Sequence, residues 1–150
     1  MRVSAAGIAQ LIPHAGNMCL LTGVVEWNEN RIRCLGRGHR DPGNPLRVRE
    51  RLPATSAIEY AAQAMATHGG LTGQIDGRPR AGYLVSLRGV ACWQAYLDDL
   101  DGDLTVEAER VLGDAERVLY RFRVCVGAVE AVSGRAMVIL DAGVGQGSMI

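Results

Sequence analysis

The chain has 150 residues, a length that suits one domain with a buried core of its own. Its 16 basic residues, all arginine, and its 16 acidic residues cancel, which excludes the overall positive charge expected of a nucleic-acid-binding protein. The four cysteines form no C-x-x-C pair, and no apolar run is long enough to span a membrane. We therefore expect a single cytoplasmic domain over residues 1–150, with free thiols and no metal site.

The first elements in chain order are a short helix and a hairpin. Residues 5–12 have the apolar periodicity of one or two helical turns that end at Pro13. Residues 18–27 and 31–38 have the composition of strands, and Asn-Glu-Asn at 28–30 is a turn signal between them. The chain thus predicts a β-hairpin after a short N-terminal helix.

The next segment, residues 39–52, is predicted to be a loop because it is rich in Arg, Pro and Gly and has no periodicity. Such a long loop in a compact domain favours a functional role. Seven arginines lie between positions 31 and 51, and four aspartates at 98, 99, 101 and 103 form a compensating acidic cluster. The ordinary interpretation of the arginines is a solvated face, and the alternative is a docking site for an acidic protein or a phosphorylated ligand.

A long helix is predicted to follow Pro53. Its apolar residues keep the spacing i, i+3, i+4, i+7, i+8, i+11, at Ile58, Ala61, Ala62, Met65, Ala66 and Gly69. The pair Gly69-Gly70 is expected to end the helix. So many small residues would let neighbouring backbone approach closely, which favours a helix wrapped by a sheet.

The remainder of the chain is predicted to be strands. After a polar loop at 72–80, strands are expected at 82–93, 104–112, 117–126 and 131–140. The glycine-rich residues 141–150 are expected to be a flexible tail. One helix among strands of period two predicts an α+β fold, an antiparallel sheet around one central helix.

Glu59 is the first candidate for chemistry, near the start of the predicted helix. The run Ser56-Ala57-Ile58-Glu59 also fits the S-x-x-E capping box, in which the glutamate bonds the N-cap amide. His39 stands where a strand enters the arginine-rich loop, a position suited to a proton shuttle or to simple hydrogen bonding. His14, which follows Pro13, is expected to cap, and His68, on the predicted helix, to be structural.

The motifs resemble those of bacterial β-hydroxyacyl-acyl-carrier-protein dehydratases, which have the hotdog fold. The family pattern P-G-x-L-x-x-E-x-x-A-Q is matched in register at Pro53, Glu59, Ala62 and Gln63. The opening L-I-P-H at 11–14, followed by the pairs Leu20-Leu21 and Val24-Val25, also resembles the family. More narrowly, I-P-H-A-G-x-M-x-L-L, H-R-x-P-x-N-P-L-R and I-E-Y-A-A-Q-A-M-A resemble dehydratase-like proteins of aryl-polyene and related fatty-acid gene clusters.

The resemblance implies the dehydration of a β-hydroxyacyl thioester carried on phosphopantetheine, with no further cofactor. A histidine would remove the Cα proton, and Glu59, by motif match, would protonate the leaving hydroxyl. His39 keeps only the G-H of the family's G-H-F-P motif, 20 residues before Glu59, and His14 is the second candidate. Binding roles are expected for Ala54, which replaces the family's glycine, and for Thr55, Gln63, Arg47 and Arg49.

The resemblance also implies partners. An acyl carrier protein would deliver the substrate, and the chain would form a homodimer or a heterodimer with a second dehydratase-like subunit. Two alternatives stay open. One is a non-catalytic hotdog subunit that supports an active partner, and the other is an acyl thioesterase, which can use a helix carboxylate without a histidine.

Overall fold

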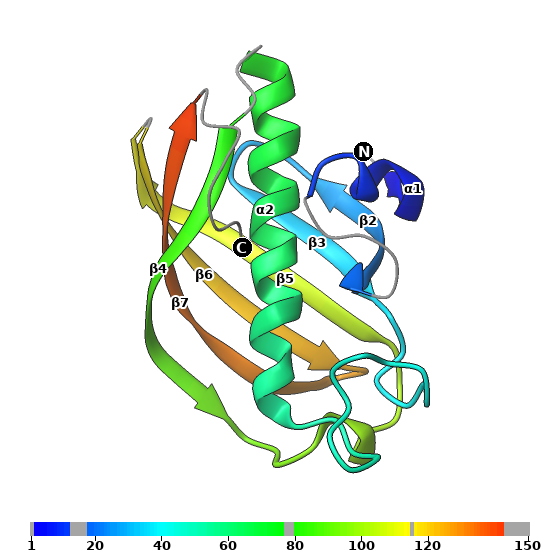
Figure 1. Ribbon diagram of the computed structural model, residues 1–150. Coiled ribbons are helices and arrows are strands. Elements are labelled where there is room, and N and C mark those ends of the chain that lie inside the picture. Colours follow the sequence, from blue (N-terminus) through cyan, green and yellow to red (C-terminus); the bar gives the residue numbers. More distant parts are fainter. Residues whose placement is uncertain (1, 13–17, 77–79, 115, 143–150) are drawn as a thin grey trace.

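The computed structural model describes residues 2–12, 18–76, 80–114 and 116–142. One antiparallel sheet curves around the long helix α2 (Figure 1). The strands lie in the order β1-β2-β3-β5-β6-β7-β4, so that β4 forms one edge. The predicted α+β architecture is confirmed. The strands are β1 Val3–Ser4, β2 Leu21–Trp27, β3 Arg31–Gly36, β4 Arg80–Cys92, β5 Leu104–Gly113, β6 Arg117–Val126 and β7 Val129–Ala142, and the helices are α1 Ala5–Ala9, α2 Ala57–Asp76 and the 3₁₀ turns η2 Ala54–Ser56 and η3 Leu97–Asp99.

Strands form at each predicted position, with bounds that differ by up to three residues, because one face of the sheet is buried against α2 and the other is exposed. In β6, Val118, Tyr120 and Phe122 are buried, whereas the alternating Arg121 and Arg123 are exposed. The hairpin of β2 and β3 also forms, with Asn28 accepting bonds from the amides of residues 30 and 31. The expected tail begins too early, since residues 141 and 142 belong to β7, and residues 143–150 lie outside the described part.

The expected end of the long helix at Gly69-Gly70 is wrong. The helix continues to Asp76, so residues 72–76 of the expected polar loop are helical. A Cβ atom at Gly70 would lie 3.2 Å from Cβ of Leu11, in the segment after α1. Gly70 therefore permits a close approach of two segments and does not terminate the helix.

The expected apolar stripe on α2 is also incomplete, because the helix is buried on most of its circumference. Tyr60, Gln63 and His68 are buried although they lie outside the stripe, whereas Ile58 and Ala66 within it are only half-buried. A sheet that curves around the helix buries more than one face, so the 3.6-residue pattern loses contrast. Cys34, Cys92 and Cys125 are free thiols, and no helix in the described ranges has the length and apolarity needed to cross a membrane.

Candidate functional site

The entrance to α2 is a 3₁₀ turn that is fixed to a neighbouring segment. The amide of Ala54 donates to the carbonyl of Ala95 at 2.9 Å, and Pro53 forms a β-bridge with Tyr96. The amide of Ser56 donates to Pro53, and that of Ala57 donates to the carbonyls of residues 54 and 55. Among the described residues of this turn, the amide of Thr55 is thus the one without a hydrogen-bond acceptor. This is common, because the first N–H groups of a helix have no partner within the helix.

Glu59 lies in the first turn of α2 beside Gln63. Glu59 is half-buried, and Nε2 of the fully buried Gln63 donates to its Oε1 at 3.4 Å. The same nitrogen donates to the carbonyl of Met18 at 2.6 Å, and Oε1 of Gln63 accepts from the amide of Leu20 at 2.8 Å. Gln63 therefore connects the segment before β2 with the helix turn that carries the carboxylate. The amide of Ser56, which the Glu59 carboxylate would bind in a capping box, donates to the carbonyl of Pro53 instead.

His39 lies in a different environment. Its ring is buried, with 5% exposed, and Nε2 donates to the carbonyl of Leu100 at 2.6 Å. Nδ1 is buried and has no hydrogen-bond partner among the described residues. A cavity of about 300 Å³ lies beside His39, at the ends of β2, β3 and β5, and Glu59 is not among its lining residues.

The loop that carries His39 contacts α2 through Tyr60. Asn44 donates to the hydroxyl of Tyr60 at 2.8 Å and to the carbonyl of Gly38, and that hydroxyl donates to the carbonyl of Arg37 at 2.9 Å. Burial raises the pKa of Tyr60, although the bond from Asn44 opposes the shift. Tyr60 and Glu59 project about 100° apart on a helix, so these contacts orient the loop toward another side of α2. Asn44 and Tyr60 are not among the predicted site residues, although both fall within the motifs that carry the family resemblance.

The acidic cluster pairs with two of the loop arginines. Arg51 pairs with Asp98 at 2.8 Å and with Asp99 at 2.6 Å, and Arg40 pairs with Asp101. Burial acts to raise the pKa of Asp98, but the Leu52 amide and Arg51 hold it below its usual value.

The two arginines predicted to bind substrate lie at a tight turn of this loop. Arg47 donates to the backbone carbonyls of Asp41 and Glu50, whereas the exposed side chain of Arg49 has no partner in the described ranges. Arg49 and Glu50 both have positive φ angles, 52° and 66°. The turn therefore presents Arg49 to solvent. His14, the remaining candidate, lies outside the described residues.

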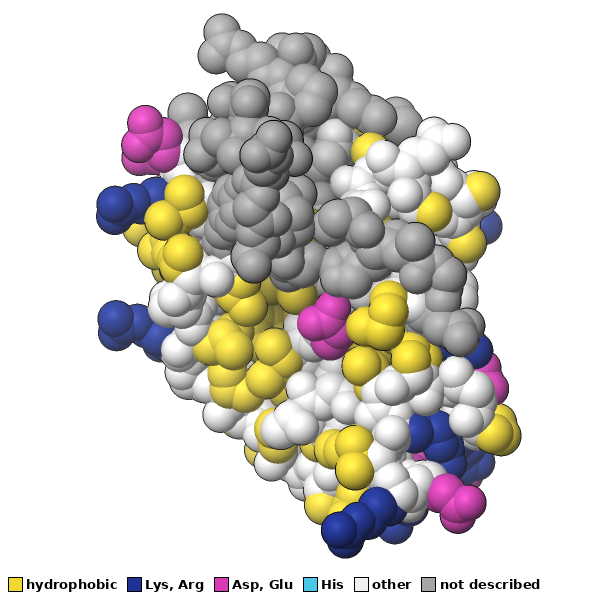
Figure 2. Space-filling model, in the orientation of Figure 1, with side chains coloured by type: hydrophobic (Ala, Val, Ile, Leu, Met, Phe, Trp, Pro, Cys, Tyr) yellow, Lys and Arg dark blue, Asp and Glu magenta, His cyan; other side chains and the backbone are white. Residues whose placement is uncertain are grey.

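An apolar surface lies on the face of the molecule where α2 is seen. Figure 2 shows hydrophobic side chains gathered beside α2 and over β4. The large hydrophobic residues exposed on β4 or directly after it are Val85, Leu87, Val90 and Trp93. Because β4 is an edge strand, its outer hydrogen-bonding groups have no neighbouring strand within the described chain. No group of residues in the described ranges is arranged to hold a metal ion.

Comparisons with known proteins agree with this architecture. The family model ApeP-like, described as ApeP dehydratase, matches residues 6–143. No curated protein sequence matches the chain. A chain of the dehydratase heterocomplex ApeI:P from Xenorhabdus doucetiae is similar, with a TM-score of 0.79 and 22% identity over 89% of this chain and 90% of that one.

Two thioesterases are similar in structure at lower identity. Thioesterase HI1161 from Haemophilus influenzae has a TM-score of 0.63 and 11% identity, covering 93% of this chain and 92% of its own. A hypothetical thioesterase with coenzyme A from Streptococcus pneumoniae TIGR4 has a TM-score of 0.60 and 9% identity, covering 79% and 84%. At these identities the structural likenesses establish the fold alone, and the hotdog fold is confirmed.

Proposed function

We propose that this chain, which belongs to the ApeP-like dehydratase family, removes water from β-hydroxyacyl thioesters carried by an acyl carrier protein. The family supports the reaction type. The assignment of catalytic residues rests on the position of Glu59. It is a half-buried carboxylate in the first turn of α2, with the side-chain amide of Gln63 beside it. The proposed setting is fatty-acid or aryl-polyene-type biosynthesis.

In the proposed mechanism, Glu59 delivers a proton to the departing β-hydroxyl group. Gln63 donates to Glu59 and is itself fixed by Met18 and Leu20, so it holds the carboxylate in one orientation. Pre-positioned groups of this kind reduce the reorganisation needed during proton transfer. Gln63 thereby acts on the reaction through Glu59.

The thioester carbonyl is proposed to bind at the 3₁₀ turn before α2. The amide of Thr55 is the donor left over after Ala54, Ser56 and Ala57 have bonded to backbone carbonyls. A donor at the positive end of a long helix stabilises the negative charge that develops on the thioester oxygen when Cα loses its proton. The methyl group of Ala54, in place of the family's glycine, narrows the approach to this turn.

A histidine is proposed to remove the Cα proton, and we rank His14 before His39. The nitrogen Nε2 of His39 is bonded to Leu100 and Nδ1 is covered, so the ring would have to leave its site in order to act. His14 stands four residues before Met18 in the sequence, and the carbonyl of Met18 is bound by Gln63 beside Glu59. This ranking reverses the order suggested by the G-H motif at His39.

Two kinds of partner are proposed. Arg49, exposed at a tight turn, and the adjacent Arg47 would contact the acyl carrier protein or its phosphopantetheine, and the acid–base chemistry needs no other cofactor. The exposed apolar residues of edge strand β4 would contact a second dehydratase-like subunit. The similar ApeI:P protein is itself a dehydratase heterocomplex, which supports the choice of a heterodimer.

The test is an assay of water loss from a β-hydroxyacyl carrier-protein substrate, with the purified chain alone and together with the second dehydratase subunit. We expect Glu59→Gln and His14→Ala to lower kcat by at least about 100-fold, the usual contribution of a general acid or base. Glu116→Gln removes an exposed carboxylate of a turn and is the matched control, expected to retain full activity. His39→Ala should act mainly through stability.

Other outcomes of this assay select the alternatives. Activity that requires the second subunit and is unchanged by Glu59→Gln and both histidine variants would make the chain a non-catalytic subunit. Release of free acid, lost in Glu59→Gln, would make it an acyl thioesterase. Loss of activity in His39→Ala with an unchanged melting temperature, and full activity in His14→Ala, would reverse the ranking of the two histidines.

A further inference from the structure

The outer face of the sheet, opposite α2, carries an unbalanced row of arginines. Cross-strand register aligns five charged residues across five neighbouring strands: Arg31 on β3, Glu109 on β5, Arg121 on β6, Arg135 on β7 and Arg88 on β4. Residues paired in this way share a face, with Cβ atoms on the order of 5 Å apart. The row therefore contains four arginines against one glutamate, and three of the arginines are consecutive.

In the adjacent row on the same face, the arginines are paired with glutamates. There Arg33 pairs with Glu26 at 3.8 Å, and Arg123 pairs with Glu107 at 2.7 Å and with Glu130 at 4.0 Å. In the arginine row, by comparison, the described residues provide one ion pair, between Arg121 and Glu109 at 3.5 Å. Arg88 and Arg135 face each other across β4 and β7 without an acidic partner in the described ranges. Like charges in directly opposed cross-strand positions destabilise a sheet.

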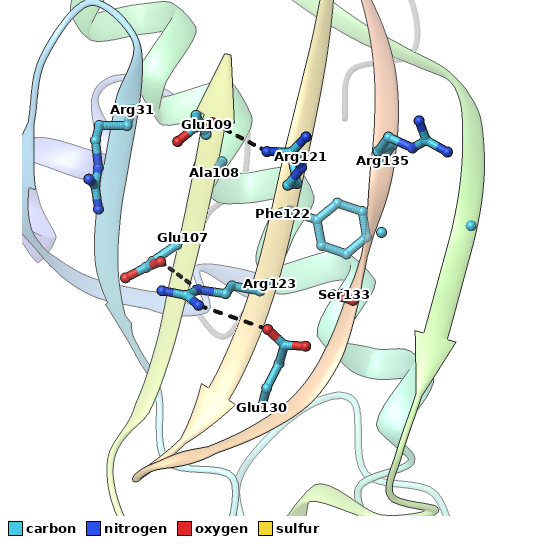
Figure 3. Close-up of a pocket in the computed structure, with 12 residues that line it drawn as sticks. Arg31, Glu107, Ala108, Glu109, Arg121, Phe122, Arg123, Glu130, Ser133 and Arg135 are labelled. Atoms are coloured by element: carbon cyan, nitrogen blue, oxygen red, sulfur yellow. Dashed lines mark hydrogen bonds and ion pairs between the residues drawn. The ribbon is translucent and has the colours of Figure 1, made fainter. Parts of the chain in front are cut away.

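The hollow beside Arg121 and Arg135 has room for a ligand. A cavity of about 580 Å³ lies over this face and is lined by Arg121, Arg135, Ser133 and Gly89, among other residues. Figure 3 shows Arg121 turned toward Glu109 and Arg135 turned away from that pair, toward β4. There Gly89 has a φ of +60°, and a Cβ atom at this position would lie 3.8 Å from Nη2 of Arg135. A glycine at this irregular position in β4 therefore leaves the space beside the guanidinium group open.

We propose that Arg88, Arg121 and Arg135 form a binding site for a ligand that carries two adjacent phosphate groups. Each guanidinium group presents a planar fork of donors that matches one phosphate, and neighbouring strands place successive forks on the order of 5 Å apart. A ligand with two negatively charged phosphate groups would bridge arginines that otherwise repel one another. The site lies on the opposite face of the sheet from α2 and does not depend on the proposed dehydratase function.

The binding test uses pyrophosphate and orthophosphate as probes on the intact protein. Isothermal titration calorimetry at constant low ionic strength should give a dissociation constant for pyrophosphate at or below about 1 mM, with orthophosphate at least about tenfold weaker. Side-chain Nε–H signals of the three arginines should shift in ¹⁵N NMR spectra. Arg135→Gln and Arg88→Gln should each weaken binding about tenfold or more. Arg33→Gln, which removes the same charge from the adjacent row, should change it less than about twofold.

A second readout comes from stability, because the row is proposed to be repulsive without its ligand. Arg135→Glu should abolish pyrophosphate binding and raise the melting temperature by about 1–4 °C, since it places an acidic residue between Arg121 and Arg88. A lower melting temperature in Arg135→Glu would overturn the argument from repulsion. Absence of pyrophosphate binding by the unaltered protein, equal loss in Arg33→Gln, or equal affinity for orthophosphate would overturn the diphosphate site.

Discussion

At the scale of single residues, the buried side chain of His68 is held in its neutral form by two hydrogen bonds. Nε2 donates to the carbonyl of Asn28 at 2.8 Å, which leaves Nδ1 to accept from the hydroxyl of Tyr120 at 2.7 Å. Burial lowers the pKa of His68, and Arg110 lowers it further, against the effect of the Asn28 carbonyl. The expectation that His68 is structural agrees with this network. The proposed proton-transfer roles belong to other residues.

The free energy of unfolding should therefore decrease as the pH falls below about 6.5, where the histidine of the unfolded chain gains a proton that folded His68 resists. Because the folded pKa is depressed, this contribution is complete above 6.5 and is lost below it, at no more than about 1.4 kcal/mol per pH unit. Urea unfolding between pH 5 and 7.5 measures the slope. His68→Gln should have a shallower slope than the unaltered protein. Equal slopes would show that another group controls the pH dependence.

At the scale of elements, η3 acts as an anchor for the segment that leads into α2. The carboxylate of Asp98 accepts from the amide of Leu52 at 2.9 Å and from Arg51, and the amide of Leu97 donates to the carbonyl of Leu52. The guanidinium group of Arg51 also lies 4.0 Å from the ring centroid of Tyr96. These contacts fix the segment just before η2, the turn that contains Thr55, to a region more than 40 residues later in the chain.

Asp98→Ala should lower the free energy of unfolding by about 1–3 kcal/mol, because it leaves the amide of the buried Leu52 without its acceptor. Asp99→Ala is the matched control in the same turn. Asp99 is 60% exposed and contacts only Arg51 among the described residues, so the loss should stay below about 1 kcal/mol. Urea denaturation compares the two. If the two variants lost the same stability, the bond to Leu52 would contribute nothing beyond the surface ion pair.

The turn at Arg49-Glu50 is a second element with a testable energy. Val48 and Arg51 exchange both backbone hydrogen bonds, so the two residues between them form a two-residue hairpin turn with positive φ at both positions. Turns of this type favour Asn-Gly because larger residues are strained there.

Arg49→Asn combined with Glu50→Gly should raise the free energy of unfolding by about 1–2 kcal/mol. Glu29→Gly changes an exposed turn residue whose φ is not positive, and should give no gain. The double variant should also bind the carrier protein more weakly if Arg49 contacts it as proposed, which a pull-down with purified carrier would measure. Unchanged or lower stability would show that the turn is not strained.

At the scale of the whole molecule, the parts that the sequence predicts well are those determined by local alternation. The strand at 117–126 is predicted to the residue, because each buried side chain in β6 alternates with an exposed or half-buried one. The length of α2 could not be predicted, since Gly70 serves a contact with Leu11, 59 positions earlier in the chain. The bond from His39 to Leu100 is equally remote in sequence. The match to the family motif identifies Glu59 as a candidate, but no sequence pattern shows which carbonyl accepts the hydrogen bond from His39.

The open edge of the sheet is the feature of the whole molecule that bears on the proposed assembly with a second subunit. Val85 lies on edge strand β4 and is 51% exposed, and an edge strand with exposed apolar residues favours pairing with another chain. Val85→Lys should weaken association with the proposed second subunit at least about tenfold, because a lysine on the edge opposes both strand pairing and apolar contact.

Leu112→Lys is the control, since Leu112 is 68% exposed near the end of β5, which lies in the middle of the sheet between β3 and β6. Sedimentation velocity over a concentration series would measure both variants. Weakening by Leu112→Lys, with Val85→Lys unaffected, would move the interface from β4 to the other end of β5. Because an edge strand can extend the sheet into a neighbouring subunit and a central strand cannot, the comparison tests the mode of assembly as well as its location.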